Sequence, residues 1–194
     1  MRMKPSIAAL TILTGLLPLC VGQIRDFGWC PNVRVQQYFD LKMYLGRWYE
    51  DRKFFAEFQA GGTCTMAEYS LKRDGSVKVK NTSYREMLGG YNSIVGQAQV
   101  FDPREPAKLG VRFFPGTPLG NYWVLETDYY QYSVVWSCRQ LDRFFNSQNC
   151  WILKRRPGPL PAPVLKRIYS MLNFYGINPD FFIVSDQTRC PGRY

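Results

Sequence analysis

Turn residues divide residues 46–155 into short segments, and their regular spacing leaves few folds open to the chain. The segments of strand length are 46–54, 63–71, 76–84, 91–101, 108–114, 121–127, 130–139 and 148–155. The links between them are rich in Gly and Pro, whose backbone angles suit tight reversals. Such short links leave no room for the helices that join parallel strands. The pattern therefore predicts an all-β antiparallel sandwich or barrel.

The sequence pattern changes after residue 155. Four prolines between residues 157 and 163 form a stiff link. Beyond it, one face of a helix is marked by Leu165, Ile168, Tyr169 and Leu172. We expect a helix over about 163–175 that lies against the outside of the sheet, because a single apolar face must be covered. A strand-like stretch at 181–185 follows, within a C-terminal strand and tail over 180–194.

The first residues have the pattern of a secretory signal peptide. A basic start precedes an apolar run over residues 7–17, which Pro18 interrupts. This run is shorter than the roughly 20 residues that a membrane-spanning helix needs. We therefore expect residues 1–22 to be removed and residues 23–194 to form one secreted domain.

If the chain is secreted, its cysteines can form disulfides and one asparagine can carry a glycan. Without residues 1–22 the chain keeps five cysteines, which are Cys30, Cys64, Cys138, Cys150 and Cys190. Widely spaced cysteines form structural disulfides in an oxidising compartment, and the odd number leaves one thiol over. Asn81 begins the sequon Asn81-Thr82-Ser83, so we expect a glycan on this residue.

Composition excludes several functional classes. The chain has no histidine, which rules out Ser-His-Asp and Cys-His catalytic pairs, His-ligated zinc and a proximal-His haem. The cysteines also lack the paired spacing of a zinc site, so we expect no metal. The 25 basic residues exceed the 15 acidic ones, but they are scattered apart from a cluster at 154–156. We interpret this charge as a solvated surface and expect no nucleic-acid partner.

Three short motifs resemble the signatures of the lipocalin family. Gly46-Arg47-Trp48 matches the first, Thr127-Asp128-Tyr129 the second, and the stretch from Trp151 to Arg155 the third, in the family's order. Further matches are similar to the branch of apolipoprotein D, Lazarillo and insect bilin-binding proteins. These matches are Cys30-Pro31-Asn32, Phe39-Asp40, Tyr44 to Glu50, Tyr69-Ser70-Leu71, Glu105 to Leu109, Tyr132, Asp186-Gln187 and Cys190-Pro191.

The resemblance implies an eight-stranded antiparallel up-and-down barrel over about 46–155, with one C-terminal helix. In this family the residues at Trp48 and Arg155 close the barrel floor, where a guanidinium packs on an indole face. The resemblance also implies the disulfides Cys30–Cys138 and Cys64–Cys190.

Cys150 departs from the family pattern and has no assigned partner. Neighbouring strand residues face opposite sides, so Cys150 points outwards if Trp151 points inwards. Either the C-terminal helix buries the thiol, which we favour, or an exposed thiol links two chains through a disulfide. The protein is accordingly expected to be a monomer or a Cys150-linked dimer.

The resemblance also implies a ligand pocket inside the barrel. The matching positions are Tyr44, Phe58, Tyr69, Phe113, Tyr122 and Trp151. Alternation would place Glu126 on the same face as Tyr122, where either a base such as Arg155 pairs with it or a bulge turns it outwards. The expected function is an extracellular carrier of a fatty acid, steroid, retinoid or bilin, with no cofactor apart from such a bound lipid or chromophore.

Two other functions compete with the carrier. A few lipocalins act on lipids through a cavity cysteine, but Cys150 is expected to face outwards and no histidine is available to activate it. We therefore expect no enzymatic activity. The pairs Phe54-Phe55 and Phe113-Phe114 lie near strand ends, where an exposed aromatic patch would contact lipoprotein or membrane surfaces. Such a patch is compatible with the carrier function.

Overall fold

The structure, a computed structural model, describes residues 24–56 and 59–192. The predicted signal peptide lies outside the described residues. The strands are β1 (Ile24–Phe27), β2 (Gly46–Phe54), β3 (Gly62–Leu71), β4 (Val77–Arg85), β5 (Gly90–Val100), β6 (Lys108–Arg112), β7 (Gly120–Thr127), β8 (Tyr132–Gln140), β9 (Phe145–Lys154) and β10 (Phe182–Val184). The helices are α1 (Leu41–Tyr44) and α2 (Ala162–Phe174), with 3-10 turns η2 (Glu86–Leu88) and η3 (Pro179–Phe181).

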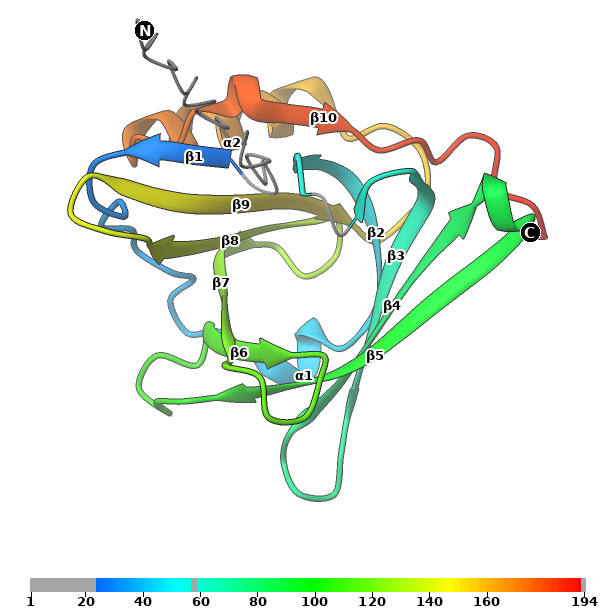
Figure 1. The fold of residues 1–194 in the computed structure, drawn as a ribbon, viewed down its shortest axis with the longest axis horizontal. Helices are drawn as coiled ribbons and strands as arrows, with labels where there is room; N and C mark the ends of the chain where they lie inside the picture. Colours follow the sequence, from blue (N-terminus) through cyan, green and yellow to red (C-terminus); the bar gives the residue numbers. More distant parts are fainter. Residues whose placement is uncertain (1–23, 57–58, 193–194) are drawn as a thin grey trace, which may run out of the picture.

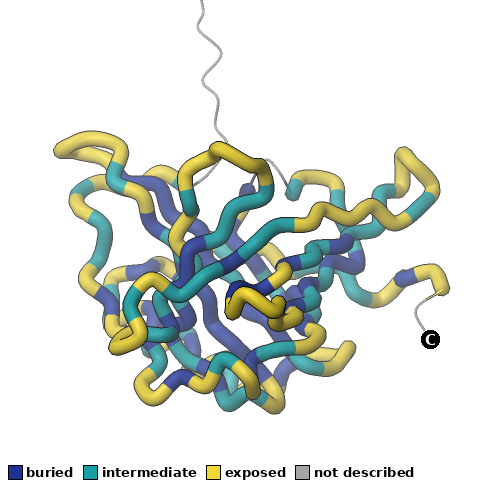
Figure 2. Tube along the Cα trace, turned by 90° about the horizontal axis from the view of Figure 1, so that it is seen from below, coloured by how far each residue is buried: buried dark blue, intermediate teal, exposed yellow. Residues whose placement is uncertain are grey.

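Eight of these strands form a closed antiparallel barrel (Figure 1). Each strand from β2 to β8 pairs with the next one along the chain, and β9 pairs with β2 to close the sheet. Strand β1 extends the sheet beyond β9, and β10 extends it beyond β2. The predicted barrel, its helix and the C-terminal strand are confirmed, whereas β1 and α1 were not predicted. Figure 2 shows the buried stretches of the chain mainly in the interior of the molecule and the exposed ones mainly around its periphery.

Arg155 and Trp48 close one end of the barrel as the family resemblance implies. The Arg155 guanidinium lies 3.8 Å from the centre of the fully buried Trp48 ring. It also donates hydrogen bonds to four backbone carbonyl oxygens, those of Met43, Leu45, Arg47 and Tyr129, at 2.7–3.0 Å. One side chain thus joins the segment before β2, the start of β2 and the loop after β7.

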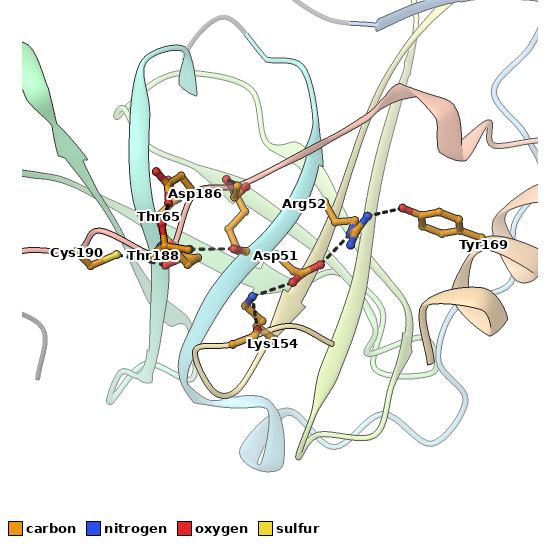
Figure 3. Close-up of polar contacts among 12 residues, drawn as sticks. Asp51, Arg52, Thr65, Lys154, Tyr169, Asp186, Thr188 and Cys190 are labelled. Atoms are coloured by element: carbon orange, nitrogen blue, oxygen red, sulfur yellow. Dashed lines mark hydrogen bonds and ion pairs between the residues drawn. The ribbon is translucent and has the colours of Figure 1, made fainter. Parts of the chain in front are cut away.

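The C-terminal segment completes the wall where β2 and β3 diverge. Strand β10 pairs with β2 at residues 52–54, beyond the stretch where β2 pairs with β3. The Gln187 side chain donates to the Thr65 carbonyl oxygen at 2.7 Å, and the Cys64 N–H donates to the Asp186 carbonyl oxygen at 2.7 Å. The Cys64–Cys190 disulfide fixes the same segment, whose Cys190 is labelled in Figure 3. The tail is therefore part of the barrel.

Helix α2 lies against the outside of the barrel, and polar contacts fix its position (Figure 3). Asp51 accepts from Lys154 at 2.8 Å and pairs with Arg52 at 2.8 Å. Arg52 in turn donates to the Tyr169 hydroxyl at 2.9 Å. Because Asp51 and Lys154 are both buried, each compensates for the loss of water around the other charge.

The cysteines pair as the family resemblance implies. Cys30 is bonded to Cys138 and Cys64 to Cys190. Cys150 is free and fully buried, in a cluster that includes Ile168 of α2. Burial in this apolar site raises the pKa of the Cys150 thiol. Of the two alternatives for this thiol, the structure shows the buried one.

We expect the Cys150 thiol to react only after unfolding, because neither reagent nor water reaches it in the native barrel. A maleimide applied to the native protein should leave Cys150 unlabelled, and the same reagent in guanidinium chloride should label one thiol in the secreted chain. Cys150→Ala should take no label in either condition. Rapid native labelling, or a covalent dimer through Cys150 on a non-reducing gel, would contradict this placement.

Replacing Arg155 by Met should lower the free energy of unfolding by roughly 2–4 kcal/mol, because carbonyl oxygens lose their donor and the indole loses its cation. Denaturant titration followed by tryptophan fluorescence measures the change. The matched control is Arg156→Met at the exposed neighbouring position, which should change stability by less than about 0.5 kcal/mol. Equal effects of the two substitutions would show that the barrel floor does not depend on Arg155.

Candidate functional site

The barrel encloses a cavity of about 420 Å³. Four of the predicted pocket residues line it, namely Tyr69, Phe113, Tyr122 and Trp151. Tyr44 lies deeper and lines a small apolar hollow together with Tyr69 and Tyr122. Phe58 falls outside the described residues.

Strand alternation explains how the lining is assembled. On β9 the cavity-lining residues are Asn149, Trp151 and Leu153, at every second position. On β4 they are Val79 and Asn81. Because a closed barrel directs alternate side chains inwards from every strand, residues far apart in sequence meet around one space. The cavity wall is thus mainly apolar and aromatic, with a few polar groups.

Three tyrosines form a hydrogen-bonded base under the cavity. The Tyr69 and Tyr122 hydroxyls are 2.8 Å apart, and the Tyr122 and Tyr44 hydroxyls are 3.0 Å apart. Tyr44 also contacts the Ser133 hydroxyl at 2.9 Å. Burial raises the pKa of Tyr44 to about 12 and moves the pKa values of Tyr69 and Tyr122 upwards as well. The base is therefore neutral at physiological pH.

A buried carboxylate stands in the wall beside the aromatic residues. Glu50 pairs with Lys53 at 2.9 Å and accepts from the Ser185 hydroxyl at 2.7 Å. The Gln59 amide donates to Glu50 at 3.0 Å and accepts from the Trp151 indole N–H at 3.1 Å. The indole N–H is thus already used inside the protein, and Trp151 offers a ligand its ring.

Sequence reasoning did not single out Glu50, although alternation from Trp48 predicts that it faces inwards. It also did not single out Asn149, which alternation from Trp151 places in the cavity. Asn149 is 7% exposed, and its side-chain Oδ1 atom is buried without a hydrogen-bond partner among the described residues.

Neither a metal group nor a cavity thiol belongs to this site among the residues that the structure describes. Across the described ranges, no group of three or more acidic or cysteine side chains is placed to hold a metal ion. Cys150 pairs across the strands with Trp136, whereas its neighbours Asn149 and Trp151 line the cavity. The free thiol therefore lies on the outer face of the wall and does not reach a molecule in the cavity.

Comparison with known proteins agrees with this architecture. Residues 39–183 match the family described as the lipocalin-like domain. This chain belongs to the lipocalin family. The lipocalin is 42% identical over 182 residues to apolipoprotein D of Cavia porcellus, covering 94% of this chain and 95% of that one.

Two further relatives extend the comparison. The Lazarillo protein of Schistocerca americana is 35% identical over 120 residues, which cover 60% of this lipocalin and 56% of that chain. The crystal structure of insecticyanin from the tobacco hornworm Manduca sexta is 28% identical, with a TM-score of 0.71 and coverage of 85% of this chain and 89% of that one. The resemblance that the sequence motifs indicated is confirmed.

Glu126 of this lipocalin faces outwards. The register between β7 and β8 shifts between Val124 and Glu126, and this bulge reverses the alternation that starts at Tyr122. Outside the barrel, Glu126 pairs with Arg167 of α2 at 2.8 Å and accepts from the Tyr132 hydroxyl. Of the two alternatives for Glu126, the bulge is confirmed and the pairing with Arg155 is wrong.

The two phenylalanine pairs considered as an aromatic patch differ in how far they are exposed. Phe54 is 2% exposed and packs against Phe182, with ring centres 4.7 Å apart, so it cannot belong to an exposed patch. Phe54 lies opposite Phe182 of the C-terminal strand β10, and the sequence pattern did not predict this pairing. Phe55 is 41% exposed and Phe114 is 61% exposed. Phe113 is half-buried because it lines the cavity.

Asn81 also lines the cavity, on β4. A glycan on this amide would share the space with a ligand. Glycosylation of Asn81 therefore stays a prediction. A chain that carries a glycan at Asn81 is not expected to bind a ligand in this cavity at the same time.

The buried tyrosines should make the lipocalin less stable at high pH. An ordinary tyrosine ionises near pH 10, so the unfolded chain loses these protons before the folded chain does. The stability contributed by the neutral base is complete below about pH 10 and is lost as pH rises through the Tyr44 pKa of about 12. Denaturant midpoints at pH 8, 9.5 and 11 should fall steeply only over the last interval.

Tyr44→Phe removes one of these titrating groups. Above pH 10 the free energy of unfolding of this variant should fall less steeply with pH than that of the unmodified protein. The two slopes should differ by up to about 1.4 kcal/mol per pH unit. The same substitution at the fully exposed Tyr38 is the matched control. Identical pH profiles for Tyr44→Phe and the unmodified protein would contradict a protonated Tyr44 in the base.

Proposed function

We propose that this lipocalin is an extracellular carrier that binds one small hydrophobic molecule inside its barrel. The observation that carries the proposal is the cavity of about 420 Å³, lined by aromatic side chains from separate strands above a neutral base. Ligand sites of about 300–1,000 Å³ with apolar walls and few polar groups are typical of small-molecule binding.

The physical driving force is the removal of apolar surface from water. A ligand that buries about 300 Å² of apolar surface gains roughly 7–8 kcal/mol from this effect. Part of that gain offsets the freedom lost on binding. Even before that offset, about 7–8 kcal/mol corresponds to a Kd of a few micromolar, so this effect alone gives at most micromolar affinity.

Fatty acids, steroids, retinoids and bilins are the ligand classes that we consider. Arg112 is the basic residue in the cavity lining, so a ligand with a carboxylate would find a charge partner there. The disulfides favour an oxidising compartment, in agreement with the predicted signal peptide. We propose a secreted monomer, because the thiol that would link two chains is buried.

A contact with lipoprotein or membrane surfaces has one supporting observation. Phe114 belongs to the cavity lining and is largely exposed. An aromatic ring at the rim would help a ligand pass between the barrel and an apolar surface. We propose this contact as an addition to the carrier function. The lipid-modifying alternative gains no such support, because the Cys150 thiol lies outside the cavity.

Trp151→Ala should weaken ligand binding roughly tenfold or more, because the ligand loses the apolar area of the indole ring. Titration of the purified protein with palmitic acid, a steroid, retinol and biliverdin, followed by tryptophan fluorescence and calorimetry, measures this effect. Trp29→Ala is the matched control, since Trp29 is 72% exposed and absent from the cavity lining.

The carrier proposal requires two results from this set of compounds. At least one compound must bind with a stoichiometry of one, and Trp29→Ala must bind it like the unmodified protein. Failure of the whole panel, or equal affinity of Trp151→Ala and the unmodified protein, would refute the assigned pocket.

A further inference from the structure

The inward-facing side chains of β8 lead from the base of the cavity to its mouth. Alternation along the strand gives the series Ser133, Val135, Ser137 and Arg139. Ser133 contacts the Tyr44 hydroxyl in the base, whereas Val135 and Ser137 line the cavity. Arg139 ends the series at an exposed position. This face of the strand therefore runs from a neutral base to a positive charge.

A polar recess of about 490 Å³ adjoins the cavity at the same end. The two hollows share the lining residues Gly120, Asn121, Ser137 and Asn149. Arg139 lines the recess, and none of the other described residues around it is acidic. A molecule that fills the cavity can therefore extend into the recess, where it meets a basic side chain.

Two polar side chains of the recess, Ser137 and Arg139, are available to a ligand. The Asn121 and Gln140 amides are already used, because they donate to backbone carbonyl oxygens. Within the described ranges, neither the Ser137 hydroxyl nor the Arg139 guanidinium takes part in a hydrogen bond or an ion pair. Because an arginine side chain is always protonated, Arg139 offers a permanent cation.

We propose that this lipocalin binds an amphiphile whose apolar chain ends in a short polar spacer and a terminal anion. This assignment rests on the proposed carrier function and adds the chemical class of the ligand to it. The apolar chain fills the cavity, a hydroxyl of the spacer hydrogen-bonds the Ser137 hydroxyl, and the anion pairs with Arg139 at the mouth.

The positions of the two side chains explain why the ligand needs a spacer. Residues two apart on one strand are about 6–7 Å from each other, so Ser137 and Arg139 contact different parts of a ligand. A fatty acid ends in its carboxylate and has no second polar group. A glycerol phosphate head carries a hydroxyl between the chain and the anion, and its phosphate oxygens match the fork of a guanidinium. The site therefore favours an acylglycerol phosphate over a fatty acid and over an uncharged acylglycerol.

Three ligands with the same lauroyl chain isolate the head group. Lauroylglycerol phosphate has the hydroxyl and the anion, lauroylglycerol lacks the anion, and lauric acid lacks the spacer. In calorimetric titrations of the unmodified protein, we expect the phosphate to bind about fivefold more tightly than either of the others. Salt screens charges near the surface, so raising sodium chloride from about 0.05 to about 0.5 M should remove most of the advantage over lauroylglycerol.

Arg139→Gln then assigns the preference to one side chain. Its affinity for lauroylglycerol phosphate should fall about fivefold, to that for lauroylglycerol, while its affinity for lauroylglycerol stays unchanged. Arg73→Gln is the matched control, since Arg73 is exposed in the link between β3 and β4 and belongs to neither lining. Ser137→Ala should weaken binding of both glycerol lipids about threefold and leave lauric acid unaffected.

The outcomes separate this inference from the carrier proposal. If none of the three ligands binds but a compound of the carrier panel does, the amphiphile assignment is wrong and the carrier function stands. If nothing in either set binds, both fail. Equal affinities for the phosphate and either of its analogues at low salt, or a preference that survives in Arg139→Gln, would overturn the assignment. A preference that is lost in Arg112→Gln instead would also overturn it, because the anion is then bound on β6.

Discussion

The packing of the Arg155 guanidinium on the Trp48 indole is the interaction on which the cavity depends. The hydrogen bonds of Arg155 to carbonyl oxygens of the segment before β2, of β2 itself and of the loop after β7 close one end of the barrel. Above this closed end the buried tyrosines stack, since Tyr44 lies between Trp48 and Tyr69 with ring centres 5.1 and 5.7 Å away. A barrel closed in this way leaves a space that is entered from the other side, which is the geometry of a binding site.

The strands were predictable because their signals are local. Turn residues and alternation act over a few positions, so the barrel strands and α2 were found from the sequence close to their observed bounds. The bulge before Glu126 was left open, because its direction is fixed by Arg167, which lies 41 positions further along the chain and on another element. The burial of Phe54 was missed for the same kind of reason, since β10 reaches β2 only in the folded protein. Local rules fail where a distant segment supplies the partner.

The candidate site shows the same division between local and non-local information. The family motifs and alternation correctly placed Tyr69, Tyr122 and Trp151 around the cavity. The sequence did not reveal which of their polar atoms are free. The Trp151 N–H, for example, donates to Gln59 in the loop before β3, 92 positions earlier in the chain. Whether a hydrogen-bonding group is available depends on the neighbours that it meets after folding, and these come from several strands.

The distribution of partnered and unpartnered groups suggests how stability and selectivity are divided in this barrel. The floor, the tyrosine base and the Glu50 cluster satisfy one another, and the disulfides hold the two ends of the chain to the wall. Such fully satisfied networks are rigid, so they hold the shape of the cavity wall. An unpaired acceptor costs about 1–3 kcal/mol in a domain whose total stability is about 5–15 kcal/mol. The barrel tolerates this cost at Asn149 because the rest of the wall is cross-linked and hydrogen-bonded.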